Sequence, residues 1–385
     1  MHNKMMGIPS KVESVMKGGV QAPGNILPSA LYAISLLYAG GLRFRQLCYR
    51  SKILPVRKLP CSVICIGNLA VGGTGKSPMT MYVAERIKHF GYRPAIVSRG
   101  YRGRAQNRGG VVSDGSSIFV GPELAGDEPY MMAGRLKDVP VVVGKDRFAA
   151  GMLALDNFKP DVMVLDDGFQ HLGLKRDVDL VLLDYLRPFG NMHLLPRGIL
   201  REPVSALQRA TACILTRYRP EAAGSAPSAM EMIKKFAPHL PVFTSTFAPY
   251  CYTIRSGAEI SINADGACAA PEAAGGLDGA TTFGFSGIAC NRDFQNTVKN
   301  MGVRIAGFME FADHHPYTAH DLKRIASAAA RANARYLITT EKDLVRIPTE
   351  NPFNLDLVVV GLRVSFGSGE QDFNAFLKDQ LAACG

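Results

Sequence analysis

The sequence has 385 residues, of which 47% are hydrophobic and 20% are charged. This length and balance fit a folded protein with two domains and exclude a chain that is disordered throughout. The net charge is +11, so we expect an anionic partner, such as a nucleotide, a nucleic acid or an anionic membrane surface. The eight cysteines have no regular spacing, which favours free thiols in a reducing compartment over a zinc site.

Positive charge is concentrated near the N-terminus, next to an uncharged apolar segment. Residues 1–60 contain nine Lys or Arg against one acidic residue, Glu13. The apolar segment, residues 26–42, is interrupted by Pro28 and two glycines and is shorter than the about 20 apolar residues of a membrane span. We expect residues 26–58 to form a helix that lies on an anionic membrane surface, with core packing and a membrane span as alternatives. We expect no nucleic-acid partner, because basic and aromatic residues do not interleave elsewhere.

A glycine-rich loop follows the short apolar run at residues 63–66. Its residues are Gly72, Gly73, Thr74, Gly75, Lys76 and Ser77. The glycines let backbone N–H groups surround phosphates, the lysine reaches the terminal phosphates, and the serine hydroxyl binds Mg²⁺. The consensus has glycine where this chain has Ala70, and a chance glycine-rich turn is the alternative. We interpret the stretch as a phosphate-binding loop for a nucleoside triphosphate with Mg²⁺.

Two adjacent carboxylates end a later apolar run. Asp166 and Asp167 follow residues 162–165, where nucleotide-binding proteins hold a metal beside the phosphates. An unpaired buried carboxylate is unfavourable, so a purely structural reason for two of them is hard to find. The phosphate-binding loop and these two carboxylates together predict phosphoryl transfer. A guanine-nucleotide switch is disfavoured, because T-E-K-D at residues 340–343 has the wrong order for its base-recognition element.

Apolar strands and helices alternate along the chain, which predicts an α/β fold. We expect a P-loop NTPase-type, mostly parallel sheet with helices on both faces, plus a smaller α/β second domain joined by a β-linker. The expected ranges are a flexible extension at 1–25, the membrane-associating helix at 26–58, a P-loop kinase domain at 59–240, a smaller domain at 241–365 with linker strands near 242–254 and 356–366, and a C-terminal helix at 366–385.

Six motifs in a fixed order resemble the lipid A biosynthetic tetraacyldisaccharide 4′-kinase family. They are G-N-L-A-V-G-G-T-G-K-S-P, S-R-G-Y-R-G, G-D-E-P, L-D-D-G-F-Q-H, G-x-L-R-E-P and F-x-D-H-H-P-Y, within roughly residues 25–365. The resemblance implies transfer of the ATP γ-phosphoryl group, with Mg²⁺, to the 4′-hydroxyl of a tetraacylated glucosamine disaccharide 1-phosphate, giving lipid IVA. It also implies a peripheral or monotopic protein, expected to be a monomer, on the cytoplasmic face of the inner membrane of a Gram-negative bacterium.

The resemblance also implies roles for individual residues. Asp127 would activate the sugar hydroxyl with His314 as its partner, and His315 is the alternative partner. The metal-side carboxylates would be Asp166, Asp167 and Glu202. The residues that contact the disaccharide or its phosphate would be Tyr101, Arg147, Gln170, His171 and Asn191. A P-loop ATPase switch or chaperone that acts on a protein partner is the alternative function.

Overall fold

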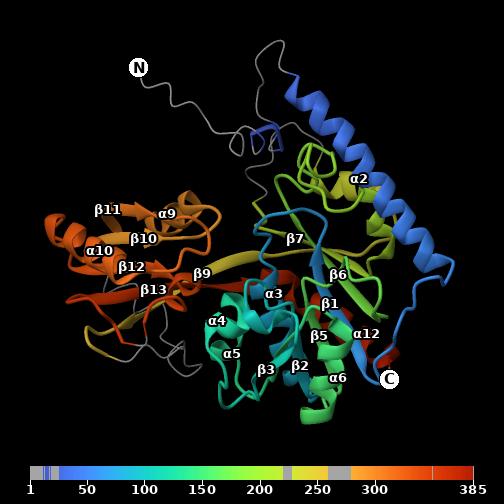
Figure 1. The fold of residues 1–385 in the computed structure, drawn as a ribbon, viewed down its shortest axis with the longest axis horizontal. Coiled ribbons are helices and arrows are strands. Elements are labelled where there is room, and N and C mark those ends of the chain that lie inside the picture. Colours follow the sequence, from blue (N-terminus) through green and yellow to red (C-terminus); the bar gives the residue numbers. More distant parts are fainter. Residues whose placement is uncertain are drawn as a thin grey trace. The chain divides into compact units, whose positions relative to one another are not determined.

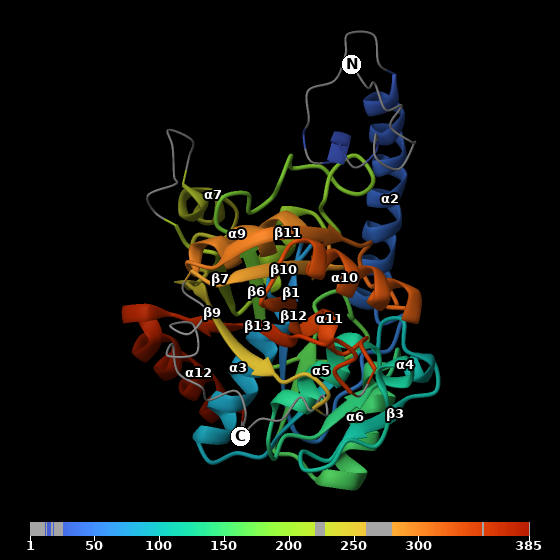
Figure 2. The same ribbon diagram turned by 90° about the vertical axis from the view of Figure 1, so that its left-hand side faces the viewer.

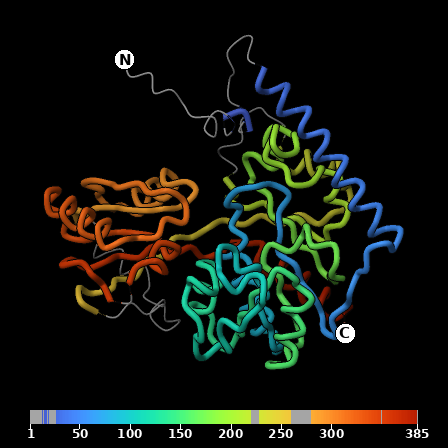
Figure 3. The backbone as a smooth tube through the Cα atoms, viewed as in Figure 1, coloured from blue at the N-terminus to red at the C-terminus, as the bar shows by residue number. Residues whose placement is uncertain are grey.

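The structure is a computed structural model that describes residues 12, 14–16, 18, 26–219, 228–258, 279–348 and 350–384. The expected extension at residues 1–25 lies almost wholly outside the described residues. The chain divides into two compact units, and each unit combines distant parts of the sequence. Figure 3 colours the backbone by residue number, so that these parts can be located. The first unit comprises Met1–Thr80, Asp161–Thr246 and Ser365–Gly385, and the second comprises Met81–Pro160 and Phe247–Val364.

The first unit is built on a parallel sheet. Its strands lie in the order β5-β1-β6-β7-β8, and every neighbouring pair is parallel. These strands are β1 (Ser62–Asn68), β5 (Val162–Asp166), β6 (Val178–Asp184), β7 (Ala212–Thr216) and β8 (Val242–Thr244). β5 and β7 are apolar and buried almost throughout, as is typical of strands that are covered on both faces. Further helical segments of this unit are η2 (Val204–Arg209), α7 (Ala229–Phe236) and α12 (Glu370–Cys384).

The N-terminal segment forms one long helix, α2 (Leu27–Arg50), which Figure 1 draws in blue. Pro28 occupies the first turn, where its missing N–H costs nothing. The helix continues through Gly40 and Gly41. Each glycine destabilises a helix by about 1 kcal/mol, and the stabilisation from tertiary packing exceeds this cost. Its inner face contacts the segment 193–202, through bonds from Ser35 Oγ to the Leu194 carbonyl and from Tyr38 Oη to the Arg201 carbonyl. No described helix is long and apolar enough to cross a membrane.

The second unit contains two groups of strands. The first group has the order β3-β4-β2, in which β2 pairs parallel and β3 antiparallel with β4. Its elements are β2 (Pro94–Ser98), η1 (Arg104–Gln106), β3 (Gly110–Ser113), α4 (Pro122–Ala125), α5 (Asp127–Arg135), β4 (Val141–Val143) and α6 (Arg147–Phe158). Most of α3 (Lys76–His89), which begins at the end of the phosphate loop, also belongs to this unit.

The other group is a five-stranded sheet with the order β11-β10-β12-β13-β9. Its elements are β9 (Thr246–Ile254), β10 (Thr281–Ser286), α9 (Asn291–Asn300), β11 (Arg304–Glu310), α10 (Ala319–Arg331), β12 (Tyr336–Thr340), α11 (Glu341–Leu344) and β13 (Asp356–Ser365). The short η5 (Gly367–Gly369) that follows β13 belongs to the first unit. Alternate residues of one strand face different helices. Leu337 packs with Ile325 of α10, and Ile338 packs with Val298 of α9. Helices α9 and α10, visible in Figure 2, therefore cover opposite faces of the sheet.

The fold class predicted from the sequence is confirmed, because the sheets are mostly parallel and carry helices. The boundaries of the compact units differ from those of the predicted domains. Residues 81–160, expected in the P-loop domain, group with residues 247–364. Two of the boundaries, at 246/247 and 364/365, fall within β9 and β13, close to the expected linker strands.

Candidate active site

The phosphate loop lies between β1 and the start of α3. Gly72 and Gly75 have φ values of +124° and +83°, which favour glycine. A methyl group on Gly72 or Gly73 would find no atom within 4 Å, so the space beside the loop is open. Lys76 keeps 13% of its side chain exposed. Open space, backbone N–H groups at a helix start and a lysine fit the phosphates of ATP.

Two polar residues that the sequence did not single out hold this loop. Nδ2 of Asn68, at the end of β1, donates to Oγ1 of Thr74 at 3.0 Å. Nη2 of Arg217 donates to the carbonyl of Gly73 at 2.8 Å, and its Nη1 pairs with Oδ2 of Asp184 at 2.9 Å. The sequence pattern that could have identified them is a polar side chain at the end of a buried strand. These bonds hold the middle of the loop, at Gly73 and Thr74.

Ala70, where the consensus has glycine, lies in a short bridge with Leu200. The backbone N–H of Val71 donates to the Ile199 carbonyl at 2.8 Å, and Arg201 donates to the Leu69 carbonyl at 2.6 Å. Ala70 is not among the residues with positive φ. Its position therefore has no conformational need for glycine, and the departure leaves the phosphate-binding part of the loop unaffected.

The two adjacent aspartates have different surroundings. Asp166 is 3% exposed and accepts a hydrogen bond from Oγ1 of Thr80 at 3.1 Å. Asp167 has a left-handed backbone, with φ 52°. Its carboxylate lies 2.9 Å from Nη1 of Arg201 and 3.8 Å from Nζ of Lys76. The contact with Lys76 brings this acid to the loop. Carboxylate and hydroxyl oxygens are donors that suit Mg²⁺.

Glu202 has a separate environment. It is fully buried, and its Oε2 lies 2.9 Å from Nη2 of Arg209 and 3.4 Å from Nε2 of Gln46. Its Oε1 has no hydrogen-bond partner among the described residues. The part of the chain that the structure describes contains no group of three or more Asp, Glu, His or Cys side chains that could hold a metal. Glu202 therefore does not form one such group with Asp166 and Asp167, and its metal role stays a prediction.

Asp127 and His314 meet within the second unit. Nδ1 of His314 lies 2.7 Å from Oδ2 of Asp127, and both side chains are 17% exposed. Burial alone would raise the pKa of Asp127, but the hydrogen bonds from His314 and Arg346 outweigh it and lower the pKa. The carboxylate is therefore ionised at neutral pH and can only accept, so Nδ1 of His314 carries the proton.

The structure distinguishes the two neighbouring histidines. His315 contacts Oδ2 of Asp321 through Nε2 at 3.1 Å. Asp321 forms the expected capping pair with Thr318 at the start of α10. His314 is thus the partner of Asp127, and His315 supports a helix end. His314 also has a left-handed backbone, φ 60°, a strained conformation of the kind that clusters at functional sites.

Of the predicted substrate residues in the second unit, Tyr101 is open and Arg147 is buried. Tyr101 is 57% exposed, and its ring lies edge-on to His314 with 6.0 Å between ring centres. Arg147 is only 4% exposed, and its Nη1 donates to the carbonyls of Gly144 and Lys145 at 2.8 and 3.3 Å. The predicted direct contact of Arg147 with substrate does not fit this burial. Its contacts shape the loop before α6 instead.

The predicted substrate residues of the first unit all have partners within the protein. Nε2 of Gln170 donates to the Asn68 carbonyl at 2.8 Å. The carbonyl of His171 accepts from Nη1 of Arg176 at 2.6 Å. Nδ2 of Asn191 donates to the Arg197 carbonyl at 3.0 Å. Their roles toward a substrate stay predictions.

Sequence reasoning missed the segment 341–346, which contacts α5 at three places. Arg346 Nε donates to Oδ2 of Asp127 at 2.6 Å, and Nη1 of Arg135 lies 2.6 Å from Oε1 of Glu341. Lys342 pairs with Glu128. The sequence feature that could have drawn attention to this segment is the T-E-K-D motif, which served above only as an argument against a guanine-nucleotide switch. These ion pairs hold the helix whose first residue is Asp127.

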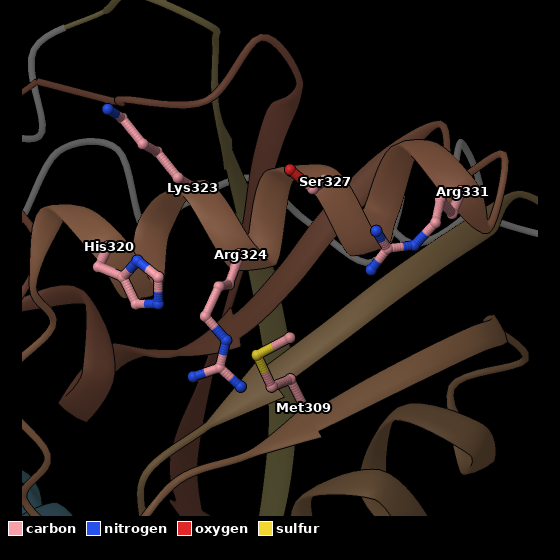
Figure 4. A pocket seen from close by; sticks show the side chains of 6 residues that line it. All are labelled: Met309, His320, Lys323, Arg324, Ser327 and Arg331. Carbon is pink, nitrogen blue, oxygen red and sulfur yellow. The ribbon is translucent and has the colours of Figure 1, made fainter.

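A surface hollow of about 430 Å³ lies elsewhere in the second unit, along α10. Figure 4 shows its lining side chains, which come from α10 except for one on β11: Met309, His320, Lys323, Arg324, Ser327 and Arg331. None of the predicted site residues lies in it. The open, solvated face of an amphipathic helix explains this hollow.

A family described as tetraacyldisaccharide-1-P 4′-kinase, LpxK, matches residues 27–382. The chain belongs to this family. It is 37% identical over 380 residues to the tetraacyldisaccharide 4′-kinase of Desulfatibacillum aliphaticivorans, covering 98% of this chain and 99% of the relative. It is 38% identical over 324 residues to the enzyme of that name from Syntrophus aciditrophicus, covering 82% and 83%.

A solved structure is also similar over most of its length. It is a crystal structure of "apo" form LpxK from Aquifex aeolicus in complex with ATP, with a TM-score of 0.70 and 31% identity. The match covers 92% of this chain and 99% of that one. The resemblance to the tetraacyldisaccharide 4′-kinase family, and with it the expectation of a kinase with a P-loop fold, is therefore confirmed.

Proposed function

We propose that this protein transfers the γ-phosphoryl group of ATP to the 4′-hydroxyl of a tetraacylated glucosamine disaccharide 1-phosphate, giving lipid IVA. The observation that carries the proposal is the 2.7 Å contact between Asp127 and His314 in a chain that also has an open phosphate loop. The family description and the names of the relatives support this substrate. ATP in the Aquifex crystal structure supports the donor.

The phosphate loop binds the donor. Backbone N–H groups of residues 72–77 bind the β- and γ-phosphates, and Lys76 stabilises the charge that spreads over the γ-phosphoryl oxygens during transfer. Ser77 with Asp166 or Asp167 would hold Mg²⁺, which would neutralise charge on the phosphate oxygens. The hard oxygen donors at these positions suit this ion.

The Asp127–His314 pair activates the acceptor. Oδ2 of Asp127 already accepts from His314 and Arg346, whereas Oδ1 has no hydrogen-bond partner in the described parts of the chain. Oδ1 takes the proton of the 4′-hydroxyl while that oxygen bonds to the γ-phosphorus and the bond to the ADP oxygen breaks. The exposed ring of Tyr101, beside His314, offers a surface for the sugar.

Helix α2 brings the protein to a lipid surface. Apolar side chains on it are exposed: Ile34 at 50%, Leu36 at 55%, Leu37 at 78%, Phe44 at 69% and Leu47 at 59%. By helical spacing they lie away from the buried Leu31, Ser35 and Leu42. Basic side chains on the same helix favour an anionic leaflet.

We infer that the protein works as a peripheral or monotopic enzyme on the cytoplasmic face of a Gram-negative inner membrane. An acylated, anionic acceptor and an apolar, basic helix support that location. One chain supplies both the phosphate loop and the base, which supports a monomer.

The deciding experiment is transfer of ³²P from [γ-³²P]ATP to the acylated disaccharide 1-phosphate in mixed micelles with Mg²⁺. We expect a labelled lipid product, no labelling of an acceptor that already carries a 4′-phosphate, and little ATP hydrolysis without acceptor. Strong ATP hydrolysis stimulated by a protein partner, with no labelled lipid, would instead identify an ATP-driven switch.

A further inference from the structure

The side chain of Arg346 lies at the centre of the groups that surround Asp127. Its Nε donates to Oδ2 of Asp127 at 2.6 Å, and its Nη1 donates to the Gly287 carbonyl at 3.1 Å and to Oδ1 of Asp343 at 3.3 Å. The side chain is 6% exposed. Its Nη2 is buried and has no partner among the described residues. An arginine in this environment has little freedom to change its orientation.

The acceptors that hold Arg346 are themselves fixed. Asp343 is fully buried and accepts from the N–H of Gly287 at 2.8 Å, from Oη of Tyr317 at 2.9 Å and from Oγ1 of Thr340 at 2.6 Å. The Gly287 carbonyl also accepts from the backbone N–H of His314 at 3.0 Å. One carbonyl therefore sets the position of both groups that donate to Asp127.

We propose that Arg346 is a positioning residue for the base, and that it fixes Asp127 through Oδ2 so that Oδ1 is the oxygen left to accept the substrate proton. This inference rests on the proposed function of Asp127. The neighbouring ion pairs Glu128–Lys342 and Arg135–Glu341 hold α5 independently, so loss of Arg346 frees the carboxylate without releasing the helix.

The charges around Asp127 predict how its titration depends on Arg346. The groups that face the pair are Arg346, His314, the buried Asp343 behind Arg346, and Asp313, whose Oδ1 lies 3.9 Å from Nε2 of His314. Without the guanidinium, only His314 opposes the effect of burial on the carboxylate. An adjacent arginine lowers the pKa of a carboxylate, so the acid limb of activity should move to higher pH when Arg346 is removed.

The test compares pH profiles of kcat for Arg346→Met, Arg346→Lys and the control Lys342→Met in the lipid transfer assay. For Arg346→Met we expect kcat to fall about tenfold or more, KM for ATP to stay constant and the acid limb to shift upward. Arg346→Lys keeps the charge without the planar fork, so its acid limb should stay near that of the unmodified protein while kcat falls by a smaller factor. Lys342→Met should leave the acid limb in place.

A folded Arg346→Met variant with an unmoved acid limb would overturn the proposal. If that variant does not fold, the Arg346→Lys variant tests the proposal. A kcat equal to that of the unmodified protein would then show that the planar guanidinium does not position Asp127. If the unmodified protein labels no lipid, the proposed function fails separately. A ¹³C titration of the Asp127 carboxyl in both proteins, assigned with Asp127→Asn, then tests Arg346 without any turnover.

Discussion

Nδ1 of His314 lies 2.7 Å from Oδ2 of Asp127, although 187 residues separate them in the sequence. This arrangement makes the pH dependence of kcat informative. If Asp127 is the base, activity persists down to acidic pH and falls only as pH drops through a carboxylate pKa that lies below its ordinary value. An acid limb at or above the ordinary carboxylate range would contradict this assignment. Asp127→Asn should lower kcat about 10²-fold or more, with ATP affinity retained in calorimetry.

Lys76→Ala tests the phosphate loop. The lysine stabilises charge that develops during transfer, so we expect kcat to fall about 10²-fold or more. Lys88→Ala is a matched control on the same helix, because Lys88 is exposed and its Nζ contacts only surface groups among the described residues, the Asp138 carboxylate and the Lys137 carbonyl. Steady-state kinetics with acylated disaccharide and Mg²⁺-ATP measures both. Full turnover by Lys76→Ala would contradict the role of the lysine.

Gly287→Ala tests the loop behind His314. A methyl group there would lie 2.8 Å from the Ala312 carbonyl and 3.2 Å from Cβ of His315, so the turn that carries His314 must move. We expect about 1–3 kcal/mol of destabilisation, seen as a lower Tm, and a loss of kcat without a change in ATP affinity. Gly369→Ala, where the methyl group would meet nothing within 4 Å, is the control. Unchanged kcat in Gly287→Ala would mean that the turn tolerates the shift.

Phe44→Asp tests whether α2 contacts lipid. Burial of a large apolar side chain contributes about 1.5–3 kcal/mol, so vesicle binding should weaken about tenfold or more. Phe119→Asp makes the same chemical change at a side chain that is 56% exposed and should bind as the unmodified protein does. Sedimentation with phosphatidylethanolamine–phosphatidylglycerol vesicles gives both values. Equal binding by the two variants would remove α2 from the proposed membrane contact.

Local patterns in the sequence were enough to predict the phosphate loop and the strands beside it. An apolar run before glycines, lysine and serine has few alternative structures, because the strand, the loop and the start of the helix follow one another directly in the sequence. The end of α2 was harder to predict. We expected the helix to extend to residue 58, but it ends at Arg50, and local propensity is a weak guide to such a boundary.

The groups around Asp127 could not be predicted from spacing. Arg346 is 219 residues away from Asp127 in the sequence, and the resemblance named only the histidine partner. Arg147 shows the opposite problem: the resemblance implies a contact with the substrate, but the side chain is buried and its Nη1 donates to the carbonyls of Gly144 and Lys145. Which polar groups become enclosed depends on how distant segments pack.

The separation between Asp127 and its partners also affects protein synthesis. The ribosome completes the phosphate loop when about one fifth of the chain exists, but Arg346 emerges close to the C-terminus. A chain that ends before Arg346 lacks one of the two side chains that donate to Asp127. A product terminated before this residue would therefore lack a positioned base, so that translation must be nearly complete before phosphoryl transfer becomes efficient.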